Sequence, residues 1–150
     1  MIYAVFRALC DKGDKVIYAV PSWNNNHYTH FVGGEHIVIQ AKAENNFMPT
    51  ADDIRPYIRE ATLISLEENI RRGDTEKKLY VMYDQMYWHL TYGDIQHYDP
   101  VSLRPAMRDY TIYIDAISKV FAATGVRVGW GMGPATVIGK MKAILTHIGA

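Results

Sequence analysis

Short apolar runs alternate with amphipathic stretches along this chain. Residues 2–9 carry apolar side chains at 2, 5, 6 and 9, a spacing that predicts a helix. The run 79–83 is continuously apolar between charged residues, which is typical of a buried strand. The predicted helices cover 2–9, about 25–32, 50–58 and 134–147, with a brief helical stretch between 66 and 79. The predicted strands cover 15–20, 36–41, 62–66, 79–83, 111–115 and 126–131.

This alternation of strands and helices predicts an α/β fold. Strands that are separated by helices pair in parallel, and both faces of such a sheet need cover. We therefore expect three layers, with a mostly parallel sheet and helices on both faces. Thr50 is expected to cap the helix at 50–58, with Asp53 as its partner in a capping box.

Composition narrows the functional classes. The 150 residues, 49% of them hydrophobic, suffice for one domain with a sizeable core. The formal net charge of zero gives no basis for binding nucleic acid or an anionic membrane. Cys10 is the single cysteine and cannot form an internal disulfide, which fits a reducing cytoplasm. We expect no signal peptide, no membrane span and no metal site.

The strongest chemical signal follows the strand predicted at 111–115. Ser118-Lys119 comes shortly after that strand, and Arg127 lies eight positions beyond Lys119, in Gly-Val-Arg-Val-Gly. Taken alone, each charged residue has an ordinary explanation. A lysine beside a strand is usually solvated, and an arginine in an apolar run is usually the outward residue of a half-exposed strand.

Three further side chains extend this signal. The strand at 79–83 is followed by Asp84, 35 positions before Lys119, and Tyr87 comes three positions after Asp84. Trp23 follows the first predicted strand. An aspartate that closes a strand is commonly a turn former, and a tryptophan is commonly a core residue. However, Trp23, Asp84 and Lys119 all lie just beyond the carboxyl end of a predicted strand, which is the edge where open α/β sheets bind ligands.

Together these motifs resemble the cofactor-lysine segment of fold-type-I pyridoxal-phosphate (PLP) enzymes, in particular the class I/II aminotransferases. That family has Ser-Lys, then small residues and Gly-x-Arg-x-Gly, with Asp-x-x-Tyr about 35 residues before the lysine. Ala116 departs from the pattern, because family members usually have glycine there. The resemblance implies the fold of the PLP-dependent transferase large domain.

The resemblance also implies a role for each of these side chains. The implied catalytic residues are Lys119, which carries PLP as a Schiff base and moves protons, and Asp84, which keeps the pyridine nitrogen charged. The implied cofactor-binding residues are Trp23 on the ring face, Asp84 at the ring nitrogen, Tyr87 at the ring oxygen, Ser118 and Arg127 at the phosphate, and Lys119.

The implied function is transfer of an amino group from an amino acid to a 2-oxo acid, by a protein that is a homodimer when full-length. Two alternatives stay open. One is another reaction on the same fold, such as that of a β-lyase, a decarboxylase or an α-oxoamine synthase. The other is a truncated product that keeps the fold without turnover.

Parts of the family pattern are missing from the sequence. The phosphate-binding loop before 2–9, the Asn-Pro loop expected near 66–67 and the C-terminal small domain are all absent. We therefore expect residues 1–150 to form an incomplete PLP-binding large domain that is inactive when isolated. Two explanations of the missing Asn-Pro loop stay open: the loop is deleted from the protein, or its residues exist but are skipped in the sequence as numbered.

Overall fold

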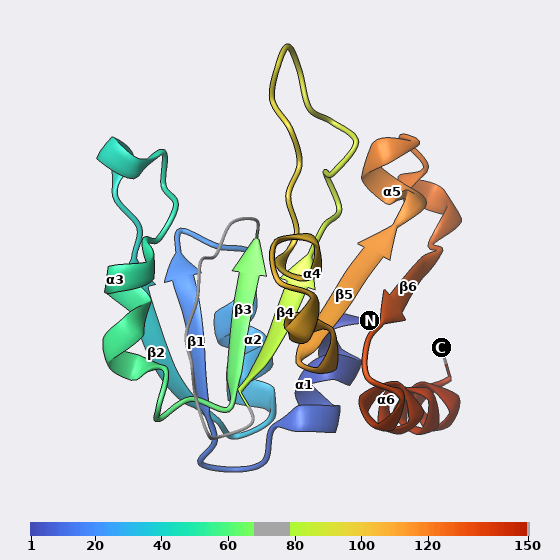
Figure 1. Cartoon of the computed structure of the whole chain (residues 1–150). Coiled ribbons are helices and arrows are strands. Elements are labelled where there is room, and N and C mark those ends of the chain that lie inside the picture. The colour runs from blue at the N-terminus through green and yellow to red at the C-terminus, as the bar shows by residue number, and fades with distance from the viewer. Residues whose placement is uncertain (68–78, 150) are drawn as a thin grey trace.

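A six-stranded sheet forms the centre of the computed structural model, which describes residues 1–67 and 79–149 (Figure 1). The strands lie in the order β2-β1-β3-β4-β5-β6. Their bounds are β1 Lys15–Val20, β2 Glu35–Gln40, β3 Leu63–Glu67, β4 Tyr80–Asp84, β5 Thr111–Ala116 and β6 Gly129–Met132. Five strands pair in parallel, and β6 pairs antiparallel to β5 at one edge.

The strand order reverses direction at β1. The chain runs outward from β1 to the edge strand β2 and then returns to β3 on the other side of β1. A reversal of this kind separates the two connections at the carboxyl ends of β1 and β3, where α/β sheets bind ligands. Figure 1 shows the arrowheads of β1, β3, β4 and β5 at the same edge, with the long segment between β4 and α4 extending beyond it.

Helices cover both faces of the sheet. Their bounds are α1 Ile2–Leu9, α2 Asn25–Phe31, α3 Ala51–Ile54, α4 Pro100–Leu103, α5 Ile117–Val120 and α6 Ala135–Ile148. On one face, Phe6 of α1 and Met141 of α6 pack in the same buried cluster as Met82 of β4. On the other face, Ile54 of α3 packs with Ile17 of β1. Each such side chain contributes about 1.5–3 kcal/mol by leaving water. The predicted three-layer α/β fold is confirmed.

Several predicted boundaries were wrong, each for a local reason. The helix expected at 50–58 ends at Ile54 and continues as a 3₁₀ turn over Arg55–Tyr57, because Pro56 has no N–H to donate. The strand expected at 126–131 begins only at Gly129, so Arg127 is not the outward residue of a strand. The helical stretch expected between 66 and 79 falls mainly on 68–78, outside the described residues.

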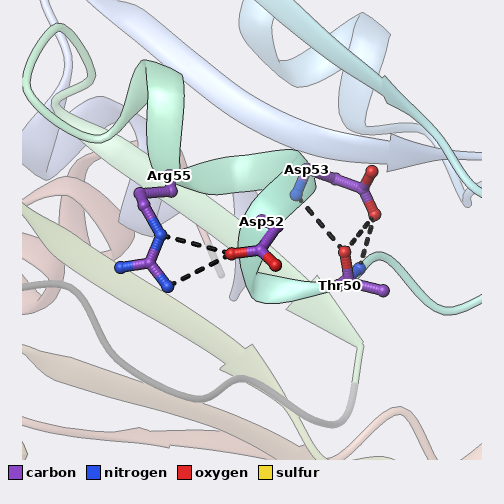
Figure 2. A network of polar contacts seen from close by, with 4 residues as sticks. All are labelled: Thr50, Asp52, Asp53 and Arg55. Atoms are coloured by element: carbon purple, nitrogen blue, oxygen red, sulfur yellow. Dashed lines mark hydrogen bonds and ion pairs between the residues drawn. The ribbon is translucent and has the colours of Figure 1, made fainter.

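The predicted capping box at Thr50 is confirmed and is drawn in Figure 2. The Asp53 N–H donates to Thr50 Oγ1 at 3.3 Å, and the Thr50 N–H donates to Asp53 Oδ2 at 2.8 Å. The Thr50 hydroxyl also donates to Asp53 Oδ2 at 2.6 Å. These hydrogen bonds from Thr50 lower the pKa of the Asp53 carboxyl below its usual value. One turn on, Arg55 forms an exposed ion pair with Asp52 at 3.3 Å.

Replacing the cap should destabilise the fold measurably. We expect Thr50→Ala to lower the free energy of unfolding by about 1 kcal/mol, because N-cap side chains contribute about that much. The Asp53 pKa is lowered on folding, so its share of the stability is complete above the unfolded pKa of about 4 and is lost as the pH falls through the folded pKa. The difference between variant and wild type should therefore narrow in acid.

Urea denaturation at several pH values measures this difference. The matched control is Arg55→Ala, which removes the neighbouring exposed ion pair and should change stability much less. Equal losses in the two variants, or a Thr50→Ala difference that does not change with pH, would contradict the role given to the cap.

Candidate functional site

A cavity of about 1140 Å³ opens at the carboxyl edge of the sheet, and all six predicted site residues line it. They are Trp23, Asp84, Tyr87, Ser118, Lys119 and Arg127. Asp84 is the last residue of β4, Trp23 and Tyr87 come from the segments that follow β1 and β4, Ser118 and Lys119 come directly after β5, and Arg127 comes from the segment before β6. The cavity is somewhat larger than most small-molecule sites, which run to about 1000 Å³.

Ser118 and Lys119 lie on α5, a single helical turn directly after β5. The Ser118 side chain is buried, whereas Lys119 is exposed, and its Nζ lies 5.8 Å from the centre of the Tyr87 ring. Gly129 allows β6 to approach the end of β5 just before this turn, since a Cβ there would come within 3.1 Å of both the Ala116 Cβ and the Asp115 carbonyl oxygen. The short turn therefore presents a lysine amine to the cavity beside a buried hydroxyl.

Asp84 and Tyr87 belong to a tight turn at the end of β4. The Asp84 Oδ1 accepts from the Met86 N–H at 3.2 Å, so the aspartate does form a strand-ending turn as well as lining the cavity. Half of the Tyr87 side chain, 54%, stays exposed to solvent. The turn therefore brings a carboxylate and a phenol to the same cavity as Lys119.

Arg127 and Trp23 lie where the backbone is unusual. Arg127 has a φ of 61°, in the left-handed region, and its Nη1 donates to the Thr124 carbonyl oxygen at 3.0 Å. This conformation is uncommon for a residue other than glycine, and it takes Arg127 out of the strand that follows. Trp23 is 73% exposed and precedes Asn24, which is also left-handed with a φ of 56°. The exposed indole is therefore a face of the cavity rather than a core residue.

The sequence did not reveal a buried polar chain, a row of hydrogen-bonded polar side chains, next to the cavity. Asn25 and Ser65 are only 4% and 5% exposed, and both line the cavity. The Ser65 hydroxyl donates to Asn25 Oδ1 at 2.8 Å, and Asn25 Nδ2 donates to Ser22 Oγ at 3.4 Å. The signal was available, because Ser65 interrupts an apolar strand and a buried hydroxyl needs a partner. These hydrogen bonds connect the segment after β1 to β3.

A second missed residue is Asp115, at the end of β5. Its carboxylate is 4% exposed, lines the cavity and accepts hydrogen bonds from Gln85 and Trp88. Both partners are about 30 residues away in sequence, so no local pattern reveals the contact. Within the described part of the chain, no group of three or more His, Cys, Asp or Glu side chains could hold a metal ion. No helix of the same part could cross a bilayer.

Comparisons with known proteins identify the family of the chain. The aminotransferase class I and II family matches residues 68–148, just over half of the chain. An aspartate aminotransferase from Streptomyces avermitilis is 29% identical over 163 residues, covering 97% of this chain and 40% of the relative. An aspartate/prephenate aminotransferase from Thermus thermophilus is 27% identical over 160 residues, covering 95% of this chain and 40% of the relative.

A solved structure also matches. The single mutant 1 of the Thermus thermophilus aspartate aminotransferase superimposes with a TM-score of 0.85 and 25% identity, over 97% of this chain and 42% of that one. The chain therefore belongs to the aminotransferase class I and II family. It spans about 40% of the length of the relatives that it matches. The aligned span in the Streptomyces protein is longer than the whole of this chain, so that relative has residues with no counterpart here.

The two hydrogen bonds of the buried polar chain should contribute differently to the free energy of unfolding. Ser65→Ala removes the donor to Asn25 and leaves a buried amide oxygen unpaired, which costs about 1–3 kcal/mol of unfolding free energy. Ser22→Ala is the matched control, because Ser22 is exposed and its hydrogen bond is long. We expect the control to lose much less in urea denaturation. A larger loss in Ser22→Ala than in Ser65→Ala would contradict this order.

Proposed function

We propose that the protein is a PLP-dependent aminotransferase, which moves an amino group from an amino acid to a 2-oxo acid. The observation that carries the proposal is the single cavity lined by all six predicted side chains. The names of the relatives support amino-acid and 2-oxo-acid substrates. The family match favours amino transfer over the other reactions that PLP enzymes perform.

The side chains of the cavity fit the chemical groups of PLP. Lys119 would hold the aldehyde carbon through its amine, since lysine is the side chain that bonds covalently to carbonyl cofactors. The guanidinium of Arg127 and the hydroxyl of Ser118 would hold the phosphate, because arginine offers several donors with a permanent charge. The exposed face of Trp23 would cover one side of the ring. When bound, PLP supplies an electron sink for the substrate's α-carbon.

One carboxylate and one phenol would set the charge of the cofactor ring. The Asp84 carboxylate would keep the pyridine nitrogen protonated, because an opposite charge favours the charged form. The Tyr87 hydroxyl would donate to the ring oxygen. The free amine of Lys119 would take the proton from the α-carbon of the substrate and deliver it to the cofactor carbon on the other side of the nitrogen, which is a 1,3-transfer. The Lys119 Nζ lies 5.8 Å from the centre of the Tyr87 ring, which supports the proposal that both groups act at one site.

We further propose that these 150 residues are an incomplete PLP-binding large domain of a protein that forms homodimers. The coverage of about 40% of each relative supports this assignment. A cytoplasmic location would suit the single cysteine: Cys10 is buried, and that burial, with the nearby Asp14 and Asp11 carboxylates, raises its pKa to about 12. Such a thiol is unreactive and needs no oxidising compartment.

Lys119 is the decisive residue for this proposal. Borohydride treatment of the full-length protein with PLP should fix a pyridoxyl group on the peptide that contains Lys119, as mass spectrometry would show. Lys119→Ala should abolish both the label and amino transfer. Lys142→Ala is the matched control, since Lys142 is exposed on α6 and does not line the cavity. Label on Lys140 or Lys142 with Lys119 clean would contradict the assignment.

Removing each of the two proposed contacts to the cofactor ring should lower kcat by a different factor. Asp84→Ala should lower kcat by about 100- to 1000-fold, the loss found when one preorganised electrostatic group is removed from a catalytic site. Tyr87→Phe should lower it by about tenfold or less, the value of one hydrogen bond, and should raise the pH at which the cofactor's visible band titrates. The measurements are steady-state kinetics and absorbance titration. Near-normal turnover in Asp84→Ala would leave Asp84 as a turn residue only.

A further inference from the structure

The carboxylate of Asp115 joins the two segments that carry the reactive side chains. It lies at the carboxyl end of β5, three residues before Ser118, and is almost fully buried. Oδ2 accepts from Trp88 Nε1 at 3.2 Å and from Gln85 Nε2 at 3.4 Å. Oδ1 accepts from the Ala116 N–H at 2.7 Å. Both oxygens are therefore engaged, and all three of these donors are neutral.

A buried carboxylate needs a structural reason, because desolvating a charge is costly unless hydrogen bonds replace the water. The donors at Asp115 come from Gln85 and Trp88, which flank Met86-Tyr87 on both sides. The Gln85 N–H also donates to the Ile114 carbonyl oxygen at 3.0 Å, so the backbone ties the start of this turn to β5. The hydrogen bond from Trp88 to Asp115 ties the other end of the turn to β5.

The position of Tyr87 depends on these two ties. Its side chain is half exposed and faces Lys119, and the hydrogen bonds within its turn are local, from Trp88 N–H to Gln85 O and from Leu90 N–H to Tyr87 O. Local bonds fix the shape of a turn but not its place above the sheet. The Asp115 carboxylate supplies that placement, and it does so from the strand that leads directly into Lys119.

We propose that Asp115 is a positioning residue that holds the turn of Tyr87 in register with Lys119. It acts through the Trp88 indole and the Gln85 amide rather than by touching substrate or cofactor. The role in catalysis rests on the proposed function, whereas the tie itself exists in the protein without cofactor. The two parts can therefore be tested separately.

The tie is tested in the full-length protein without cofactor, by hydrogen exchange of the backbone amides of Trp88 and Leu90. Asp115→Ala and Trp88→Phe should each speed this exchange by about tenfold or more, because both remove the bond that closes the turn. Exchange in β1 and α6 should stay unchanged, which shows that the fold is intact. Asp94→Asn, an exposed carboxylate on the same segment, is the matched control and should have no effect. Unchanged exchange in Trp88→Phe would overturn the proposal.

The route through Tyr87 is tested with PLP bound. Asp115→Ala should raise the pH midpoint of the cofactor's visible band in the same direction as Tyr87→Phe, and the double variant should show no further shift. Asp115→Asn keeps an oxygen that can accept from Trp88, so it should recover part of the wild-type midpoint. A full additional shift in the double variant, or an asparagine variant as impaired as alanine, would mean that the charge acts directly and would overturn the positioning role.

The two experiments distinguish a failure of the proposed function from a failure of the positioning role. If wild type binds no PLP, the proposed function fails, while the exchange experiment still decides whether Asp115 holds the turn. If wild type binds PLP and Asp115→Ala changes neither the exchange nor the midpoint, the positioning role fails and the proposed function stands. If Asp115→Ala does not fold, Trp88→Phe carries both measurements, because it removes the same bond and keeps an aromatic ring in place.

Discussion

Parallel pairing of β1, β3, β4 and β5 is the constraint on which the rest of the structure depends. A parallel ladder places the carboxyl ends of its strands at one edge, and the segments that leave those ends start side by side. Trp23, Asp84 and Lys119 are 61 and 35 positions apart in sequence, yet they line one cavity because each lies at or just beyond the carboxyl end of such a strand. The pairing in turn requires cover on both faces, which α1, α2 and α6 provide on one side and α3 on the other.

Short turns then decide which atoms reach the cavity. Asp84 folds back on the Met86 N–H, Lys119 lies on a helix of one turn, and Arg127 adopts a left-handed backbone before β6. None of these turns buries much apolar surface, so their shapes come from hydrogen bonds and from the strands on either side. Gly129 is the clearest case, since a side chain there would collide with Ala116 and push β6 away from β5.

The sequence predicted the elements that carry long apolar patterns and failed where local geometry decides. The helix at Ile2–Leu9 and the strand at Lys15–Val20 were predicted with their bounds, because burial imposes a period on several consecutive turns or pleats. The helix α5 was missed because four residues show no period, and β6 was misplaced because Gly-Trp-Gly-Met alternates without an apolar face that identifies its start. The six site residues came from spacing that resembles a family, whereas Asn25, Ser65 and Asp115 have partners far away in sequence.

The two cavity carboxylates show how environment separates residues of one type. Asp115 is buried, and neutral N–H groups from Trp88, Gln85 and Ala116 donate to both of its oxygens, so hydrogen bonds within the protein already engage this carboxylate. Asp84 is only partly buried and lines the cavity, and its Oδ1 accepts from the Met86 N–H in a tight turn. A carboxylate that must meet a ligand has to stay accessible, while a carboxylate that must fix a turn needs hydrogen bonds from the residues of that turn. The difference in burial therefore agrees with the two proposed roles, ligand contact for Asp84 and support of the Tyr87 turn for Asp115, although both aspartates lie at the carboxyl ends of neighbouring strands of the same sheet.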